Sequence, residues 1–331
     1  MATFGEKTKV LALLSGGLDS TLAVKIMLEQ GLVVEAVNFT TPFCLCDKCA
    51  IDSVSKKFQI KVHKVLLGQE FLDLVAAPPH GYGSGMNPCM DCRILMLRKA
   101  KAVAQKIGAK CIVTGEVLNE RPFSQRKDSM FLIEREAGLE GKILRPLSAK
   151  LLPETEFEKE GLIDREKLFS IKGRRRLPQM SLAKTWNIND YPCPAGGCLL
   201  TDPQFALRLR DFLTYSCKLT LRDIVLLKIG RHFRIGDCKI VVGRNSEENK
   251  ILLTLAKREN KPYLEVINYM SPIVLLEGSN VDHVVEEAAR IAVRYSDAPK
   301  DTSVDVRHVA TDMNIMKVRA AKDEEIELSR I

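Results

Sequence analysis

The hexapeptide SGGLDS at residues 15–20 combines the residue types and spacing that could bind a phosphate. It lies between a short apolar run at residues 10–14, which is typical of a buried strand, and apolar residues at helical spacing that continue to Gly31. A glycine turn between a strand and a helix directs several backbone N–H groups at one point beside the positive end of the helix dipole. The residues that could contact a nucleotide here are Ser15, Gly16, Gly17, Asp19 and Ser20.

Asp19 is an unusual neighbour for a phosphate unless its carboxylate holds a Mg²⁺ ion that bridges to the nucleotide. The loop is not a Walker loop, because no Gly-Lys-Ser/Thr follows it, and it is not a G-x-G-x-x-G loop. An ordinary turn rich in small residues would explain SGG alone, but it explains the whole hexapeptide in this position poorly. We therefore interpret residues 15–20 as a nucleotide-binding loop.

The elements around this loop predict an α/β fold. Strand-like runs follow at residues 32–39, 60–67 and 110–114, with helix-like segments between them. This alternation predicts a doubly wound, mostly parallel sheet, whose ligands gather at the carboxyl ends of the strands. Asn38 and Phe39 end one run and Gly115 follows another, so we expect all three near the nucleotide, with Asn38 and Phe39 flanking the adenine.

The last third of the chain has a different pattern, in which shorter runs are separated by glycines. The β-like runs are residues 224–227, 232–235, 239–242, 264–267 and 273–276, and the helical runs are residues 246–257 and 281–295. This pattern predicts a second, smaller α/β domain. We expect a nucleotide-binding domain at residues 1–170, a basic, cysteine-containing connecting segment at residues 171–216, and the small domain at residues 217–331.

Composition limits the classes of protein that the chain could belong to. The formal charge is +8 over 331 residues, and the sequence pI is about 8.9, which favours a polyanionic partner. Arg174, Arg175 and Arg176 form a local basic patch. No apolar run approaches the roughly 20 residues of a membrane span, and the first apolar segment is too short for a signal peptide, so we expect a cytoplasmic protein. Ten cysteines in such a chain favour metal binding or thiol chemistry over disulfides.

Five segments, read in order, resemble one enzyme family. They are SGGLDS, NPCMDC, VTGEVLNERPFSQ, LRPLSAKLLPET and CPAGGCLLTDP, and together they resemble the tRNA-thiolating branch of the PP-loop ATP pyrophosphatases, the 2-thiouridine and 4-thiouridine synthases. This resemblance extends from about residue 8 to residue 212. The segment from RHFRIGDCKIVVGRNSEEN to RYSDAP is similar to the RNA-associated module at the end of NFACT proteins.

The resemblance implies an ATP-dependent tRNA sulfurtransferase that forms AMP and pyrophosphate. ATP would adenylate a uridine carbonyl, and sulfur would then be inserted, with sulfide on a [4Fe-4S] cluster as its source. The implied partners are tRNA and a sulfur donor, either sulfide or a persulfide carrier. Two alternatives stay open: a PP-loop sulfurtransferase or ligase acting on a small molecule, and a non-catalytic RNA-binding adaptor.

The cysteines supply the expected cluster ligands. Cys89 and Cys92 have the C-x₂-C spacing with which two thiolates share one metal or cluster at a helix start, although a redox-active pair has the same spacing. As in cluster-dependent thiolases, a third cysteine would complete the site. We favour Cys198, because the two glycines before it let the backbone approach a cluster, and we keep Cys193 in reserve. The residues implied to be catalytic are Asp19, Cys89, Cys92 and Cys198.

Structural zinc is the principal rival to the cluster. Zinc prefers four closed ligands, and the tight group Cys44, Cys46 and Cys49 offers a separate candidate site for it. The remaining cysteines, Cys111, Cys217 and Cys238, are interpreted as apolar side chains in or near the core.

Overall fold

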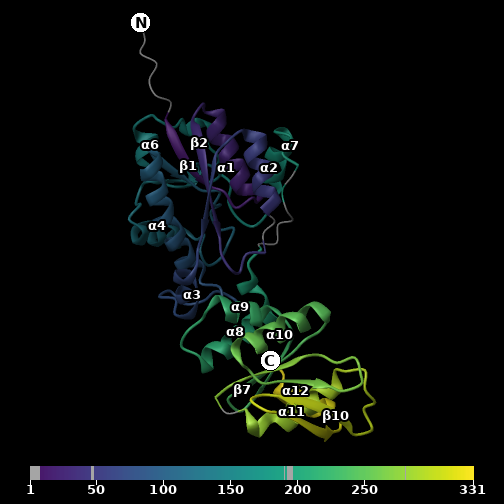
Figure 1. Ribbon diagram of the computed structural model, residues 1–331. Coiled ribbons are helices and arrows are strands. Elements are labelled where there is room, and N and C mark those ends of the chain that lie inside the picture. The colour runs from purple at the N-terminus through teal and green to yellow at the C-terminus, as the bar shows by residue number, and fades with distance from the viewer. Residues whose placement is uncertain (1–7, 46–47, 190, 192–196, 280) are drawn as a thin grey trace. The chain divides into compact units, whose positions relative to one another are not determined.

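The computed structural model describes residues 8–45, 48–189, 191, 197–279 and 281–331. The chain divides into two compact units, Met1–Thr201 and Asp202–Ile331 (Figure 1). Residues 171–201 belong to the first unit, where helix α7 (Leu177–Thr185) packs against α1 (Leu18–Glu29). None of the helices in the described ranges is long and apolar enough to cross a membrane.

The first unit is built on a five-stranded parallel sheet with the order β3-β2-β1-β4-β5. Its strands are β1 (Lys9–Leu13), β2 (Val33–Thr40), β3 (Val62–Leu66), β4 (Cys111–Val113) and β5 (Ile143–Leu144). The chain runs outward from β1 to β3 and then returns to the other side of β1, so the order reverses between β1 and β4. Open parallel sheets bind ligands at this reversal, outside the carboxyl ends of the strands. The expected doubly wound fold is confirmed, but strand β5 was not predicted.

The helices of the first unit cover both faces of this sheet. Besides α1 and α7 they are α2 (Lys48–Phe58), α3 (Gln69–Ala76), α4 (Cys89–Ile107), α5 (Lys127–Ala137) and α6 (Glu156–Lys159), with 3-10 turns at Ala149–Leu151, Arg165–Lys167 and Leu199–Thr201. Val10 and Ala12 of β1 pack into the cluster that contains α1 and α7, and Leu11 and Leu13 pack into the cluster that contains α4 and α5. Because side chains alternate along a strand, burial on both faces explains why β1 is apolar throughout.

The second unit contains a six-stranded antiparallel sheet with the order β11-β10-β8-β9-β7-β6. Its strands are β6 (Arg231–Ile235), β7 (Cys238–Val242), β8 (Tyr263–Val266), β9 (Val274–Glu277), β10 (Val304–Val309) and β11 (Met313–Val318). Its helices are α8 (Pro203–Tyr215), α9 (Leu221–Lys228), α10 (Ser246–Glu259), the 3-10 turn η4 (Asp282–Val284), α11 (Val285–Arg294) and α12 (Asp323–Ser329). A second, smaller α/β domain is therefore confirmed.

One predicted strand of the second unit is wrong. Residues 224–227 lie within α9, which begins with a capping box: the Thr220 hydroxyl accepts a hydrogen bond from the Asp223 N–H, and the Asp223 side chain accepts one from the Thr220 N–H. This local signal overrides the β-like appearance of a short apolar run. Strands β10 and β11 and helix α12 were not predicted, although Val304 and Val306 alternate with polar residues in β10.

Candidate functional site

The loop between β1 and α1 has the conformation of an anion site. Gly16 has a φ of +81°, a backbone conformation that favours glycine. The Ser20 hydroxyl donates to the Gly17 carbonyl at 2.9 Å and accepts from the Ser15 N–H at 3.3 Å, which closes the turn. No side chain caps the start of α1. The first N–H groups of the helix can therefore serve an anionic ligand.

Gly115 lies directly against this loop, as the sequence predicts. A Cβ atom at Gly115 would lie 2.5 Å from both the carbonyl carbon of Asp19 and the nitrogen of Ser20. The chain leaving β4 therefore passes so close to the first turn of α1 that no side chain fits between them. Glycine is required here because two backbone segments meet, and the contact fixes the position of the phosphate loop.

Gly115→Ala is expected to lower the stability of the first unit by about 1–3 kcal/mol, the usual cost of overpacking, and to weaken ATP binding at least tenfold. The clash is with backbone atoms, so relief requires the phosphate loop itself to move. Gly17→Ala serves as the control for stability, because Gly17 has an extended backbone and its nearest contact would be at 3.5 Å. Denaturant unfolding and ATP titration of both variants test the expectation; equal stability of the two would contradict it.

Asp19 is partly buried in the first turn of α1 and belongs to a charged cluster. The Arg176 guanidinium donates to Asp19 Oδ2 at 3.0 Å and to Glu120 at 2.9 Å. Burial, followed by the neighbouring Glu120 carboxylate, raises the pKa of Asp19 to about 6, while Arg176 and the nearby amide of Gln179 act in the opposite direction. Oδ1 of Asp19 is buried and makes no hydrogen bond of good geometry among the described residues, although the Gln179 amide lies near the carboxyl group. This oxygen has the capacity to bind a cation.

Helix α7 supplies two site residues that the sequence did not reveal. Arg176 is the N-cap residue of this helix, without a side-chain cap hydrogen bond, and Gln179 is fully buried in its first turns. The Gln179 amide lies close enough to Asp19 to lower the pKa of that carboxyl, although neither of its polar atoms makes a hydrogen bond of good geometry within the described part of the chain. A buried amide beside Asp19 with spare hydrogen-bonding capacity is suited to a polar ligand. Arg174 and Arg175, in contrast, are exposed.

Asn38 and Phe39 lie at the carboxyl end of β2, next to the phosphate loop. The Asn38 amide is buried and donates to the Leu14 carbonyl at 2.9 Å, which ties the end of β2 to the start of the loop. Phe39 is partly buried against the cluster that contains Leu11 and Leu13. Asn38 therefore connects the end of β2 to the start of the loop, and Phe39 packs in the core beneath the sheet's carboxyl edge. The contact of both residues with an adenine stays a prediction.

Four cysteines gather at this same edge of the sheet. Cys89 and Cys92 occupy the first turn of α4, and Cys44 and Cys198 face each other in an antiparallel bridge. Cys89, Cys198 and Cys44 all lie close enough to Cys92 to affect its pKa. The structure thus brings together the three predicted ligands and adds Cys44.

Backbone hydrogen bonds hold the three cysteine segments together. The Leu45 N–H donates to the Gly197 carbonyl at 2.6 Å, and the Leu199 N–H donates to the Phe43 carbonyl at 2.9 Å. The Met86 N–H donates to the Leu200 carbonyl, also at 2.9 Å. A Cβ at Gly85 would lie 2.5 Å from that same carbonyl oxygen, so the loop before Cys89 and the segment after Cys198 are in direct contact.

The thiols have the surroundings of metal ligands. Burial raises the pKa of Cys92 to about 12 and that of Cys198 to about 11, and neighbouring thiols add to both increases. N–H groups point at two of the other sulfurs: the Asn87 amide donates to Cys89 Sγ at 3.0 Å, and the Thr41 N–H donates to Cys44 Sγ at 3.4 Å. Buried thiols ionise readily only when a cation binds them, and N–H donors stabilise the resulting thiolates. Within the described residues no three of these thiols lie within 4.8 Å of one another, so their spacing suits an iron–sulfur cluster better than a single metal ion.

The structure shows one cysteine contact that the expected grouping did not include. Cys44 lies beside Cys198, 154 residues further along the chain. Spacing could not reveal this contact, because it depends on how the segment after α7 folds back. Cys46, the reserve ligand Cys193 and the side chain of Cys49 lie outside the described residues.

A buried ion network connects the cysteines to the sheet. Glu116, two residues beyond Thr114 at the end of β4, pairs with Arg93 at 3.0 Å and with Arg145 at 3.0 Å. Burial opposes ionisation, but the two guanidinium groups outweigh it and lower the pKa of Glu116. Arg145 also pairs with Glu134 of α5. Because Arg93 follows Cys92 directly, this network fixes the first turn of α4 relative to the phosphate loop.

Comparison with known proteins gives two family matches on separate parts of the chain. Residues 5–150 match the model described as "Thiamine biosynthesis protein (ThiI)", and residues 230–329 match "NFACT protein RNA binding domain". Both resemblances drawn from the motifs are confirmed by these matches.

Two curated relatives are similar to less than half of the chain. A probable tRNA sulfurtransferase of Geobacillus sp. (strain WCH70) is 33% identical over 150 residues, which cover 43% of this chain and 35% of that protein. A probable tRNA sulfurtransferase of Thermococcus kodakarensis is 29% identical over 146 residues, covering 43% and 38%. The chain therefore spans little more than a third of the length of these relatives.

Two solved structures show more distant similarity. A 4-thiouridine synthetase–RNA complex with bound ATP has a TM-score of 0.35 at 21% identity, covering 67% of this chain and 52% of that one. The U34-tRNA thiolase NcsA from Methanococcus maripaludis with its [4Fe-4S] cluster has a TM-score of 0.32 at 18% identity, covering 67% and 73%. TM-scores this low carry no argument about function.

Proposed function

We propose that the protein is an ATP-dependent tRNA sulfurtransferase, which adenylates a uridine carbonyl and replaces its oxygen with sulfur. The observation that carries this proposal is the arrangement of the first unit, where an uncapped glycine loop and four cysteines lie at the carboxyl edge of one parallel sheet. The family match over residues 5–150 and the tRNA sulfurtransferases similar to it support the same reaction.

The nucleotide step follows from the phosphate loop. Backbone N–H groups at the start of α1 hold the phosphates of ATP, and the uridine carbonyl oxygen attacks the α-phosphorus. The bond to the bridging oxygen breaks, so pyrophosphate leaves and the base carries AMP. Arg176 and the Gln179 amide, which lie beside Asp19, are proposed to contact the phosphates. Asp19 would hold a Mg²⁺ ion, which neutralises phosphate charge.

The sulfur step belongs to the cysteines. Cys89, Cys92 and Cys198 would hold a [4Fe-4S] cluster, with Cys193 in reserve for Cys198. Such a cluster, when bound by three thiolates, supplies one iron without a protein ligand, where sulfide can bind. When sulfur adds to the adenylated carbon, the bond from that carbon to the AMP oxygen breaks and AMP departs. Free sulfide or a persulfide carrier is the donor, and Zn²⁺ is the rival metal.

The RNA is proposed to contact both units. Residues 230–329 match an RNA-binding domain, and the exposed Arg174 and Arg175 of the first unit offer contacts to backbone phosphates. The uridine must be single-stranded or flipped out of a helix to reach the adenylation site. A tRNA-modifying enzyme of this kind acts in the cytoplasm.

Pyrophosphate release with and without tRNA tests the proposal. The protein is incubated with ATP and Mg²⁺ without oxygen, and pyrophosphate is measured as uridine-containing tRNA is added. We expect release to depend on tRNA. Release that is unaffected by tRNA would indicate the small-molecule enzyme, and no release under any condition would indicate the RNA-binding adaptor.

RNA affinity is expected to fall steeply with salt, and Arg174→Ala/Arg175→Ala is expected to flatten that dependence. Each lost phosphate contact reduces the slope of log affinity against log salt by about 0.7–0.9, so the pair should reduce it by about 1.5. Arg176 is left intact because it pairs with Asp19. Lys159→Ala/Lys167→Ala removes the same charge from exposed positions in the same unit and is the control. If the slope of log affinity against log salt is unchanged in the arginine variant, Arg174 and Arg175 are solvated surface residues that do not contact the RNA.

A further inference from the structure

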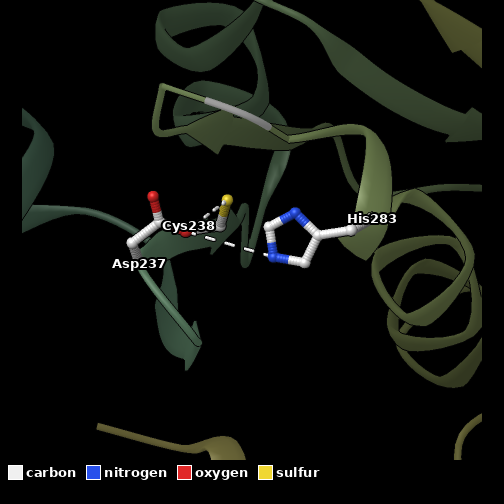
Figure 2. Close-up of side chains that lie close together, drawn as sticks. All are labelled: Asp237, Cys238 and His283. Atoms are coloured by element: carbon white, nitrogen blue, oxygen red, sulfur yellow. Dashed lines mark hydrogen bonds and ion pairs between the residues drawn. The ribbon is translucent and has the colours of Figure 1, made fainter.

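Asp237, Cys238 and His283 bring three different metal-binding atoms together in the second unit (Figure 2). One ligand atom from each lies within 4.8 Å of the other two. Oδ1 of Asp237 is 3.6 Å from Cys238 Sγ and 4.0 Å from His283 Nε2. The dashed lines in Figure 2 join one carboxylate oxygen of Asp237 to the thiol and to the imidazole, so this oxygen faces both of the other groups.

The fold, and not the local sequence, assembles this group. Ile235 pairs with Cys238 across the β6–β7 hairpin, so Gly236 and Asp237 form a two-residue turn. Gly236 takes a φ of +58°, as the first position of such a turn requires when it is of type II′. This turn holds the Asp237 and Cys238 side chains next to each other. His283 comes from η4, a turn that is anchored to α11, 45 residues further along the chain.

Two glycines leave space around the ligand atoms. A Cβ at Gly278 would lie 2.9 Å from Cys238 Sγ, and a Cβ at Gly236 would lie 3.6 Å from His283 Nε2. The Ser279 hydroxyl donates to Asp237 Oδ2 at 3.2 Å, which leaves Oδ1 facing the thiol and the imidazole. Hydrogen bonds of this kind orient the ligands of metal sites.

The three residues differ in burial, so one side of the group is covered by protein and the other is open to solvent. Cys238 is fully buried, whereas the side chains of Asp237 and His283 are 52% and 49% exposed. The thiol is therefore the innermost of the three groups, and the carboxylate and the imidazole lie nearer the solvent. An ion can enter from solvent, and one coordination position faces water.

We propose that Asp237, Cys238 and His283 bind a divalent transition-metal ion of the zinc type, with water in the fourth position. In a tetrahedral zinc site, a thiolate sulfur and a carboxylate oxygen lie about 3.6 Å apart, and an imidazole nitrogen and a carboxylate oxygen about 3.4 Å apart. The sulfur–oxygen distance here already matches, and the nitrogen–oxygen distance of 4.0 Å closes by a small rotation of exposed side chains.

The ligand types select the class of ion. One sulfur, one nitrogen and one oxygen suit Zn²⁺ or Co²⁺, whereas Mg²⁺ and Ca²⁺ prefer oxygen alone. On binding, the thiol proton leaves to solvent and the thiolate sulfur bonds to the ion, with no change in oxidation state. The bound ion connects the β6–β7 turn to the start of α11 within the part matched to an RNA-binding domain. The plainer alternative is an exposed His–Asp ion pair above a buried, apolar thiol.

A cobalt titration of the full-length chain separates the two. The competing thiols Cys44, Cys46, Cys49, Cys89, Cys92, Cys193 and Cys198 are first replaced by alanine. We expect one Co²⁺ per chain, with the sulfur-to-cobalt charge-transfer band and the intense d–d bands of tetrahedral cobalt. Cys238→Ala is expected to abolish the band and His283→Ala to weaken binding at least tenfold. Cys217→Ala, which removes an exposed thiol of the same unit, is the control and should change nothing.

A second measurement keeps the natural cysteines. Native mass spectrometry counts the zinc ions bound by the otherwise unmodified protein and by its His283→Ala variant, whose exposed side chain can be removed without disturbing the core. The variant should carry one zinc fewer per chain. Equal zinc counts, or an unchanged affinity for cobalt in His283→Ala, would overturn the proposal. Neither result depends on whether the first unit thiolates RNA.

Discussion

Asp19→Asn is expected to abolish the formation of AMP and pyrophosphate and, at the same time, to make the metal-free protein more stable at pH 7.5. The two effects share one cause. Asp19 is partly buried beside Glu120, and its pKa is raised from 3.8 to about 6. At pH 7.5 the folded state therefore carries a charged carboxylate at a cost in free energy, as expected of a group kept for cation binding.

The pH dependence of that gain has a defined sign. A raised carboxyl pKa means that the stability contributed by protonated Asp19 is complete below pH 3.8 and is lost as the pH rises through about 6. A shift of about two pKa units corresponds to about 3 kcal/mol, which is the upper bound for the gain from asparagine above pH 6. Below about pH 4 the variant and the natural protein should be equally stable.

Denaturant unfolding at several pH values, without nucleotide or Mg²⁺, measures the stability difference, and a pyrophosphate assay measures the loss of activity. Asp73→Asn is the matched control, because Asp73 is exposed on α3 and its neutralisation should change neither quantity. Full pyrophosphate formation by Asp19→Asn would remove the phosphate loop from the mechanism. A variant less stable than the natural protein at pH 7.5 would show instead that the Arg176 contact outweighs burial.

The second large effect concerns iron. Purified without oxygen, the protein is expected to be brown and to carry about four irons per chain, as a [4Fe-4S] cluster requires. Cys89→Ala, Cys92→Ala and Cys198→Ala should each lose the iron and stop thiolation. ATP should still bind to these variants, because its phosphates are held by backbone N–H groups of the loop at residues 15–20.

The position of Cys44, which the sequence did not reveal, adds a further variant to this experiment. Because Cys44 lies beside Cys198, Cys44→Ala tests whether the site uses three thiolates or four. We expect Cys44→Ala to keep its iron, since three ligands leave one iron open for sulfide. Loss of iron in that variant would indicate a closed site, and a colourless protein with stoichiometric zinc would indicate the structural metal. Cys217→Ala is the control for a cysteine outside the site.

The parts of the site that the sequence could predict are local. The hexapeptide at residues 15–20 can be recognised as a nucleotide-binding loop because a strand precedes it and a helix follows it. Gly115 could be predicted because the carboxyl ends of parallel strands share one edge of a sheet. The reason for glycine at that position needed the structure. A Cβ at residue 115 would lie 2.5 Å from backbone atoms of Asp19 and Ser20.

The parts that the sequence could not predict depend on contacts between distant segments. Arg176 looked like one of three equivalent basic residues, yet it donates to Asp19, 157 residues before it. Gln179 gave no signal, since a single amide on a helix is usually exposed. Cys238 was interpreted as an apolar core residue, and only the hairpin turn and η4 bring Asp237 and His283 to its sulfur.

Sulfur transfer to RNA tests the central claim most directly. The protein reconstituted with iron and sulfide is incubated with ATP, Mg²⁺, a sulfur source and unmodified tRNA, and the nucleosides of the digested tRNA are analysed by mass spectrometry. We predict a thiouridine that appears only with ATP and is absent with Asp19→Asn and with Cys92→Ala. Tight tRNA binding and ATP cleavage by the natural protein without any thiouridine would contradict the assignment.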